Sequence, residues 1–263
     1  MNFLSAVIIT RNEEQNIGRC LDSLKQVADE IIVLDSFSTD NTVAITTQKG
    51  AEVMQSPFSG YIEQKNKALL LARYDYVLSL DADEVLSHDL IKSILEAKKD
   101  FKHKAYFMNR YNHYCGRFIK FGLWYPDQKV RLFDKRFAYW GGMNPHDKIQ
   151  LSNQLSAHFL KGDILHYGFN NIREHKERNE RMSAIAALAI FESGQKKHWS
   201  KIFLSPAWSF FNGFILRLGF LDGYYGFIIA RETARRSFLK YQKLKALQKQ
   251  HSSIILHNYK TVE

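Results

Sequence analysis

Tyr76-Val77-Leu78-Ser79-Leu80-Asp81-Ala82-Asp83-Glu84 is the stretch that decides the fold. Its first five residues have the length and composition of a buried strand, and carboxylates follow directly where that strand ends. A buried carboxylate without a partner is costly, so a cation or a hydrogen-bonded sugar is its natural occupant. Mg²⁺ usually takes one or two carboxylates together with phosphate oxygens. The Asp81-Ala82-Asp83 triplet therefore indicates a metal–diphosphate site, although most such triplets are solvated turns.

The chain before this stretch alternates apolar runs with helical patterns. Strands are predicted at Leu4–Thr10, Glu30–Leu34, Ala51–Gln55 and Tyr76–Leu80, and helices at Asn16–Leu24, Asn41–Gln48 and Glu63–Ala72. Continuous apolar strands separated by helices are typical of an α/β fold whose parallel sheet is covered on both faces. Ligands of such sheets bind beyond the carboxyl ends of the strands. We therefore expect Thr10, Asp35 and the Asp81/Asp83 pair along one rim.

Composition narrows the class of protein. The chain has 263 residues, 45% of them hydrophobic, which suits one large α/β domain with an extension. Its only cysteines are Cys20 and Cys115. We therefore expect no disulfide framework, and we expect the protein to function in a reducing, cytosolic setting. The apolar start, residues 1–10, lacks the basic leader and long core of a signal peptide. A net charge of +10 predicts an anionic partner: a nucleotide, a phosphorylated glycan, an anionic lipid or a nucleic acid.

The middle of the chain, Ala105–Leu165, is strand-like and rich in aromatic residues. Rings beside Asn109, Arg110 and His113 could stack on a sugar while the polar groups contact its hydroxyls. The same rings could equally be core residues, and the sequence leaves both interpretations open.

The residues after position 170 predict a helical, basic C-terminal extension. Asn171–Phe191 has a helical pattern, Ile202–Ala230 is apolar but interrupted, and Arg231–Gln250 carries seven basic residues against one acid. No run of 18 apolar residues occurs, so a membrane-spanning helix is not expected. An apolar stretch followed by a basic amphipathic helix is typical of a segment that lies on an anionic bilayer. A soluble helical subdomain or a dimer contact is the alternative.

Three motifs in order along the chain resemble family 2 glycosyltransferases with a GT-A fold. They are Ala6-Val7-Ile8-Ile9-Thr10-Arg11-Asn12-Glu13-Glu14, Ile32-Val33-Leu34-Asp35-Ser36-Phe37-Ser38-Thr39-Asp40-Asn41-Thr42 and Leu78-Ser79-Leu80-Asp81-Ala82-Asp83-Glu84. Further segments resemble the bacterial lipopolysaccharide inner-core β-glucosyltransferases over nearly the whole chain. These are Gln64-Lys65-Asn66, Tyr114-Cys115-Gly116-Arg117, Trp124-Tyr125-Pro126-Asp127, Arg131-Leu132-Phe133 and Gly219-Phe220-Leu221-Asp222-Gly223.

The resemblance implies a domain plan and a donor site. Residues 1–170 would form the GT-A catalytic domain, a Rossmann-like, mostly parallel sheet flanked by helices. Its nucleotide-sugar half would be about 1–100 and its acceptor half about 101–170; residues 171–263 would be the helical extension. The nucleotide-sugar contacts implied by position are Thr10, Asp35, Lys65 and Asp81. Asp83 would hold Mg²⁺ or Mn²⁺. Many members have two consecutive acids where this chain has Asp35-Ser36; a uridine nucleotide is the default donor.

An inverting transfer also needs a carboxylate base within hydrogen-bond reach of the acceptor hydroxyl. The resemblance implies Asp147, which follows His146, as the first candidate, and Asp127 as the second. Arg131, His146 and Trp124 are candidate contacts to the diphosphate or the acceptor. For His146 and His166, a structural hydrogen-bonded histidine and a role near the metal or diphosphate both stay open.

The activity that the resemblance implies is transfer of a hexose, with glucose as the default, from a UDP-sugar to a saccharide acceptor. The implied acceptor is an inner-core heptose of lipopolysaccharide or lipooligosaccharide. The protein would then be cytoplasmic and peripheral on the inner membrane, in contact with anionic lipid. Another cell-surface polysaccharide is an alternative acceptor.

The sequence disfavours three other classes of protein. A sugar nucleotidyltransferase is disfavoured because Thr10–Asn16 contains no glycine to cradle a triphosphate. Nucleic-acid binding is disfavoured because the positive charge lies mainly in the tail and no recognition motif occurs. An inactive transferase-like scaffold is disfavoured by the retained carboxylates.

Overall fold

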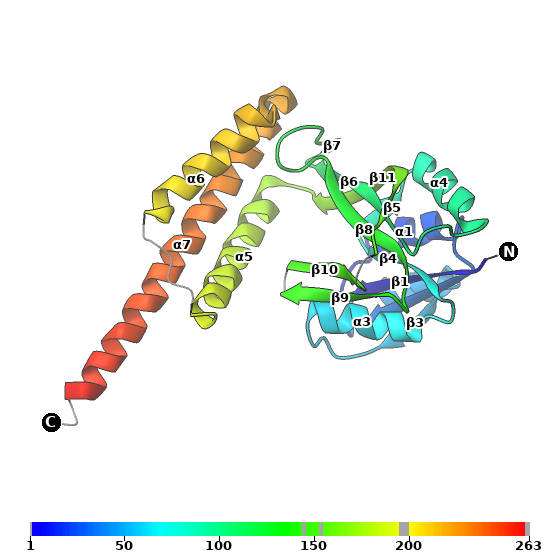
Figure 1. The fold of residues 1–263 in the computed structure, drawn as a ribbon, viewed down its shortest axis with the longest axis horizontal. Helices are drawn as coiled ribbons and strands as arrows, with labels where there is room; N and C mark the ends of the chain where they lie inside the picture. The colour runs from blue at the N-terminus through cyan, green and yellow to red at the C-terminus, as the bar shows by residue number, and fades with distance from the viewer. Residues whose placement is uncertain (1, 144–145, 153–154, 195–199, 261–263) are drawn as a thin grey trace. The chain divides into compact units, whose positions relative to one another are not determined.

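The computed structural model describes residues 2–143, 146–152, 155–194 and 200–260 (Figure 1); the side chains of Met143, His146 and residues 251–260 lie outside this description. The chain divides into two compact units. The first is Met1–His113 with Pro126–Gly168, and the second is Tyr114–Tyr125 with Phe169–Glu263.

The first unit is an α/β layer structure, as the alternating sequence pattern predicts. Its elements are β1 (Leu4–Thr10), α1 (Ile17–Leu24), β2 (Glu30–Asp35), α2 (Thr42–Gln48), β3 (Glu52–Gln55), α3 (Tyr61–Leu71), β4 (Tyr76–Asp81), β5 (Glu84–Leu86), α4 (His88–Lys98), β6 (Ala105–Tyr114), β8 (Asp127–Asp134), β9 (Ala138–Met143), β10 (His146–Leu151) and β11 (His158–Phe169). The main sheet has the order β3-β2-β1-β4-β8-β6-β11-β5, and β9 and β10 form a separate antiparallel pair. The predicted α/β fold is confirmed.

The sheet is parallel in its first half and antiparallel in its second. β1 pairs in parallel with both β2 and β4, and β2 pairs in parallel with β3. Helical crossovers return the chain in the same direction each time, which parallel pairing requires. Beyond β4, strand β8 runs antiparallel to both β4 and β6. The four parallel strands therefore end at one edge, where ligands bind in sheets of this kind.

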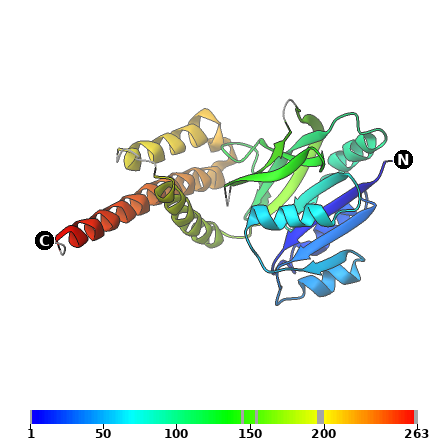
Figure 2. The ribbon, with the colours of Figure 1, turned by 60° about the horizontal axis from the view of Figure 1, so that its bottom comes forward.

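Alternate residues of the strands point to opposite faces of the sheet and pack into two separate hydrophobic cores. On one face, Leu4, Ala6 and Ile8 of β1 pack with buried residues of α1 and α4. On the other face, Val7 packs with Ala68 and Leu69 of α3, the helix that Figure 2 shows in cyan along the sheet. Burial on both faces explains why the parallel strands read as continuous apolar runs.

The second unit is mainly helical. Its elements are β7 (Arg117–Phe118), α5 (Ile172–Glu192), α6 (Lys201–Phe211), a π-helical turn η1 (Asn212–Leu216), a 3₁₀ turn η2 (Gly219–Asp222) and α7 (Gly223–Lys260). Figure 1 shows α6 and α7 as an antiparallel hairpin, in yellow and orange-red. The hairpin closes tightly because a Cβ on Gly226 would lie 1.8 Å from the carbonyl oxygen of Gly219.

No single helix in the described part of the chain is both long and apolar enough to cross a bilayer. The pair Lys201–Leu216 and Gly219–Gln250, bent by 73°, meets the length and composition criteria only when its two helices are taken together.

Candidate active site

The rim of the site begins where β1 and β2 end side by side, with Thr10 paired in register with Asp35. The loops that follow are tied together by Asn12: its N–H donates to Ser38 Oγ (2.8 Å), and its Oδ1 accepts from the N–H of Thr39 (2.8 Å). Asn12 has a left-handed backbone (φ 56°), a conformation that asparagine tolerates better than most residues. The motif after β1 therefore shapes the rim.

Thr10 and Asp35 differ in the number of hydrogen bonds that their side chains make. The buried carboxylate of Asp35 accepts hydrogen bonds from Ser38 N (2.9 Å), Ser38 Oγ (2.5 Å) and Gln55 Nε2 (3.3 Å). The buried hydroxyl of Thr10, by contrast, has no hydrogen-bond partner among the described residues. A buried hydroxyl without a partner costs stability, so a bound ligand could satisfy Thr10 at this rim.

At the centre of the site, Lys65 joins two of the predicted site residues. Lys65 is in α3, Asp81 ends β4 and Asp147 is in β10. The ammonium Nζ of Lys65 lies 2.9 Å from Asp81 Oδ1 and 2.8 Å from Asp147 Oδ2. It also lies 4.2 Å from the ring centroid of Trp140, which is a cation–π distance. Asp81 and Asp147, which come from distant parts of the sequence, thus share one buried cation.

Arg131 in β8 extends this network on the other side of Asp81. Its Nη2 lies 2.9 Å from both Asp81 Oδ2 and Glu84 Oε1. Burial would raise the pKa of Asp81, but the charges of Lys65 and Arg131 outweigh burial and hold that pKa far below its ordinary value. Asp81 therefore has a low affinity for a proton and is a poor candidate for the general base.

Asp127, the second candidate base, is also tied to cations. Its Oδ2 accepts from Arg110 Nε (2.9 Å) and Nη2 (2.7 Å), and its Oδ1 lies 2.9 Å from Lys129 Nζ. Burial opposes ionisation of Asp127, yet the charges of Arg110 and Lys129 lower its pKa below the ordinary value. Asp147 uses only Oδ2 for Lys65, and Oδ1 has no hydrogen-bond partner in the described part of the chain. The geometry thus favours Asp147 as the acid that could accept a proton.

Asp83 lies beyond β4 and pairs with a histidine from β11. The Oδ2 atom of Asp83 is 3.2 Å from His166 Nε2, and His166 Nδ1 is 2.6 Å from Asn112 Oδ1. Because the Asn112 oxygen accepts the Nδ1 proton, Nε2 is the ring nitrogen that faces the Asp83 carboxylate. In the neutral form of a histidine ring, such a nitrogen carries a lone pair that can bind a metal ion.

Asp83 and His166 therefore fit a divalent metal ion as a carboxylate and an imidazole ligand, with Asn112 orienting the imidazole. Among the described residues, no group of three or more His, Cys, Asp or Glu side chains could hold such an ion. The remaining ligands would have to be water and oxygens of a bound diphosphate, as is usual for Mg²⁺. Gly168 leaves room for this arrangement, because a Cβ there would lie 2.7 Å from His166 Cε1.

Asn66 holds the β9–β10 hairpin that carries Asp147. Its Nδ2 donates to the carbonyl oxygen of Trp140 (2.8 Å), and its Oδ1 accepts from the Trp140 N–H (2.9 Å). The side-chain amide thus takes the place of a neighbouring strand along β9. Since Asp147 pairs in register with Gly142 of β9, this contact fixes Asp147 relative to Lys65.

The cluster described above does not include two of the predicted contacts. Trp124 belongs to the helical unit, where its ring stacks on Phe169 (centroids 5.6 Å apart) and meets Tyr114 edge-on (5.3 Å). The side chain of His146 lies outside the described residues. For both residues, contact with the diphosphate or the acceptor stays a prediction.

The family of the chain follows from comparison with known proteins. The model of the family "Glycosyl transferase family 2" matches residues 5–159, a range that contains the strand-end residues described above. The chain belongs to glycosyltransferase family 2. This assignment confirms the resemblance carried by the three motifs and supports sugar transfer over nucleotidyl transfer.

Curated relatives of this glycosyltransferase extend over almost the whole chain. An uncharacterized glycosyltransferase of Rickettsia felis is 32% identical over 260 residues, which cover 93% of this chain and 90% of the relative. The lipopolysaccharide core biosynthesis glycosyltransferase LpsC of Rhizobium meliloti is 28% identical over 260 residues, covering 92% and 91% of the two chains. Among solved structures, glucosyl-3-phosphoglycerate synthase of Mycobacterium tuberculosis, in complex with Mn²⁺, UDP and glucosyl-3-phosphoglycerate, is 25% identical over 43% of this chain and 44% of its own, with a TM-score of 0.35.

Several residues of the glycosyltransferase site were not predicted as such. Glu84 and Arg110 complete the ion-pair network, Asn112 orients His166, and Asn66 fixes the hairpin. Arg110 was placed only among possible sugar contacts. These four residues share one feature: each is a polar residue within an otherwise apolar strand or on a buried helix face. A sequence shows such a residue but does not show which residue it contacts.

Proposed function

We propose that this family 2 glycosyltransferase transfers a hexose, with glucose as the default, from a UDP-sugar to an inner-core heptose of lipopolysaccharide or lipooligosaccharide, with inversion at the anomeric carbon. The observation that carries this proposal is the cluster in which Lys65 joins Asp81, at the end of a parallel strand, to Asp147. The name of the relative LpsC, a lipopolysaccharide core biosynthesis enzyme, supports the acceptor class.

In this proposal, Asp147 is the general base. Its Oδ1, which has no partner among the described residues, accepts the proton of the acceptor hydroxyl while the hydroxyl oxygen attacks the anomeric carbon. The bond from that carbon to the diphosphate oxygen breaks on the opposite face, and UDP leaves with the bonding electrons. Asp127 is a poorer base because both its oxygens are held by cations that lower its pKa.

The donor would lie along the rim. Thr10, whose hydroxyl has no partner among the described residues, and Asp35, at the end of the adjacent strand, would contact the nucleotide. Asp81 and Lys65 would lie at the ribose and diphosphate end. Asp83 and His166 would hold Mg²⁺ or Mn²⁺ there. Such an ion supplies positive charge that stabilises the departing diphosphate. Arg131 would act mainly by holding Asp81, since it is already paired with that residue and with Glu84.

A donor screen tests the proposal. UDP-, GDP- and ADP-hexoses are offered with Mn²⁺ or Mg²⁺, and nucleotide release is measured with a heptose-containing core oligosaccharide as acceptor. We expect binding of UDP-sugars and metal-dependent release of UDP. Binding confined to GDP- or ADP-sugars would overturn the uridine assignment, and transfer only to other glycans would overturn the heptose assignment in favour of another cell-surface polysaccharide.

Point variants separate the roles of the acids. Asp147→Asn should abolish transfer but keep donor binding, whereas Asp83→Asn should remove the metal dependence together with most of the activity. Asp127→Asn tests the second candidate base, and Asp89→Asn, on the exposed first turn of α4, is the matched control. Wild-type activity in Asp147→Asn, with loss in Asp127→Asn, would reverse the assignment of the base.

A lipid-linked acceptor would place the enzyme at the cytoplasmic face of the inner membrane. Peripheral binding to anionic lipid fits the basic tail, and nucleic acid is not part of the proposal.

A further inference from the structure

The helical unit exposes a concentration of large apolar side chains. Nine of them between Phe203 and Leu221 are exposed, among them Leu204 (67%) and Trp208 (60%). Soluble monomers rarely expose apolar patches of more than a few hundred Å², and larger ones mark sites for a partner or a membrane. This segment, here called the α6 face, comprises α6, η1 and residues 217–221.

The helical spacing of the sequence explains the exposure. Leu204, Trp208, Phe211 and Ile215 recur every three or four residues, so they lie on one side of the α6–η1 helix. The other side packs on α7, where Ser205 Oγ lies 2.9 Å from Ser237 Oγ. The apolar side chains are thus left over after the hairpin has formed its own core.

The charges around the α6 face have one sign at the surface. Residues 201–250 contain nine Lys and Arg residues and only two acids, Asp222 and Glu232. Both acids are buried, with 4% and 1% exposure. Asp222 accepts from the backbone N–H groups of Lys120 (3.2 Å) and Phe121 (2.8 Å). The exposed charge of the hairpin is therefore positive.

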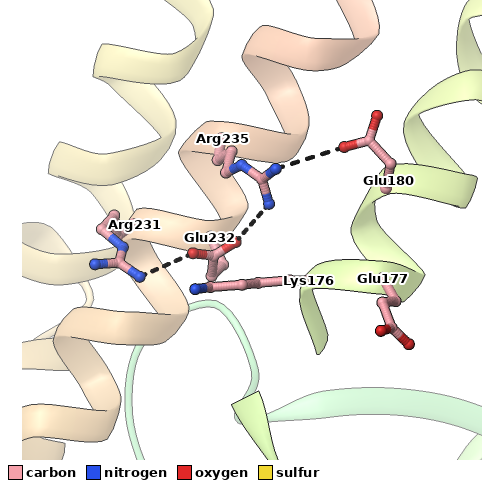
Figure 3. Close-up of a pocket in the computed structure, with 6 residues that line it drawn as sticks. All are labelled: Lys176, Glu177, Glu180, Arg231, Glu232 and Arg235. Atoms are coloured by element: carbon pink, nitrogen blue, oxygen red, sulfur yellow. Dashed lines mark hydrogen bonds and ion pairs between the residues drawn. The ribbon is translucent and has the colours of Figure 1, made fainter. Parts of the chain in front are cut away.

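A pocket beside α7 shows how Glu232 is used (Figure 3). Its walls are Lys176, Glu177, Glu180, Arg231, Glu232 and Arg235, three bases and three acids. Glu232 lies 3.0 Å from Arg231 and 3.4 Å from Arg235, and Arg235 also reaches Glu180 (3.5 Å). The pocket offers a ligand no net charge, so the α6 face is the stronger candidate for a partner.

We propose that the α6 face lies in the headgroup–acyl boundary of an anionic lipid bilayer. The face itself carries two exposed bases, Lys201 and Arg217, and no acid. An apolar surface with exposed cations is complementary to such a boundary, where lysine and arginine reach the headgroups from partly buried stems. Arg217, within the face, would take such a position. The face deepens the proposed function, because a lipid-linked acceptor would bring the bilayer and the enzyme together.

A second copy of the chain fits this face less well. Self-association through it would bring two sets of exposed cations together with both nearby acids already buried, and like charges across an interface are unfavourable. Spanning the bilayer by the α6–η1 helix alone also fits poorly, because its 16 residues, Lys201–Leu216, form about 24 Å of helix against about 30 Å of hydrocarbon.

Vesicle sedimentation with the full chain, without donor or acceptor, tests the proposal. We expect binding to phosphatidylglycerol/phosphatidylcholine vesicles, weaker binding to phosphatidylcholine alone, and release by alkaline carbonate. Leu204→Gln with Leu216→Gln should lower the partition coefficient at least about tenfold, since each removes a large apolar side chain from the lipid. Leu70→Gln, at an 82% exposed position of α3, is the matched control. Quenching by brominated lipid that disappears in Trp208→Phe would place Trp208 in the bilayer.

Equal partition of wild type and the double variant would overturn the proposal, as would resistance to carbonate extraction. A concentration-dependent dimer that the double variant abolishes, without vesicle binding by the wild type, would assign the face to a second copy. Transfer to a soluble core oligosaccharide should be the same in wild type and double variant. Failure of the lipid proposal is thereby distinguishable from failure of the proposed function.

Discussion

Replacing Asn66 by alanine should uncouple the hairpin that carries Asp147 from α3. The two hydrogen bonds between the Asn66 amide and the backbone of Trp140 would be lost, leaving a buried N–H and a buried C=O unpaired. Each such group costs about 1–3 kcal/mol, so docking of the hairpin should weaken by about 2–6 kcal/mol. A loss of about 3 kcal/mol changes the ratio of docked to undocked hairpin by roughly a hundredfold.

For catalysis, we expect the Asn66→Ala substitution to affect kcat more than the donor KM. An undocked hairpin removes Asp147 from Lys65 but leaves Thr10 and Asp35 in place, because β1 and β2 hold those residues. We therefore expect kcat to fall at least about tenfold while the donor KM changes less than about threefold. Amide hydrogen exchange should increase in β9 and β10 and stay unchanged in β1 and β2.

Lys148→Ala is the control, because Lys148 neighbours Asp147 in β10 and its side chain is exposed. It should leave both kcat and the exchange rates unchanged. If Asn66→Ala exchanged faster in β9 and β10 but kept full kcat, the positioning argument would be refuted. If neither quantity changed, the two hydrogen bonds would not hold the hairpin.

Three further predictions concern the metal site, the central cation and the helical unit. Gly168→Ala should raise the metal concentration needed for half-maximal activity several-fold, because the new Cβ would displace the His166 ring; an unchanged metal titration would contradict the pairing of His166 with Asp83. Lys65→Met should lower the free energy of unfolding by about 3–5 kcal/mol in urea titrations, since the buried cation shared by two carboxylates is removed; an unchanged midpoint would show that these acids are satisfied without it. Burial lowers the pKa of His175 from 6.5 to about 4 in the folded protein. Between these two pH values the imidazole is protonated in the unfolded chain but neutral in the folded unit, so a falling pH favours unfolding. The helical unit should therefore lose about 3 kcal/mol between pH 6.5 and 4, a slope that His175→Gln should flatten in denaturant titrations at each pH.

Local patterns in the sequence were sufficient for the parallel half of the sheet. The predicted strand Leu4–Thr10 is observed unchanged, and the predicted strand Tyr76–Leu80 continues only to Asp81. Both strands are buried on two faces, so nearly every residue in them is apolar. Such a continuous apolar run can be recognised in the sequence without knowing which strands lie beside it. The rim formed by Thr10 and Asp35 followed from the same pattern, because parallel strands end together.

The contacts across the site were not predictable in this way. His166 lies beside Asp83 only because β11 pairs with β5, and Asp147 meets Lys65 only because Asn66 holds β9. Such pairings depend on the register between strands that are far apart in the sequence. This register produces no periodic pattern in the local sequence from which it could be predicted. Family resemblance placed Asp147 before Asp127 as the candidate base, but it gave no geometric reason for that order.

Helix α3 gives an argument for the site that is independent of any motif. Its buried positions include Gln64 and Lys65, with 0% and 5% exposure, whereas Leu70 is 82% exposed. Burying a lysine is costly, and a buried ion pair adds less stability than apolar residues of similar volume would. A helix that places polar groups inside and leucine outside departs from the pattern that stability alone favours, and such departures are expected where a functional site requires them. The cost is understandable if Lys65 is needed to hold Asp81 and Asp147 together. A Lys65→Met variant that was more stable than wild type and still active would remove this reason for the buried cation.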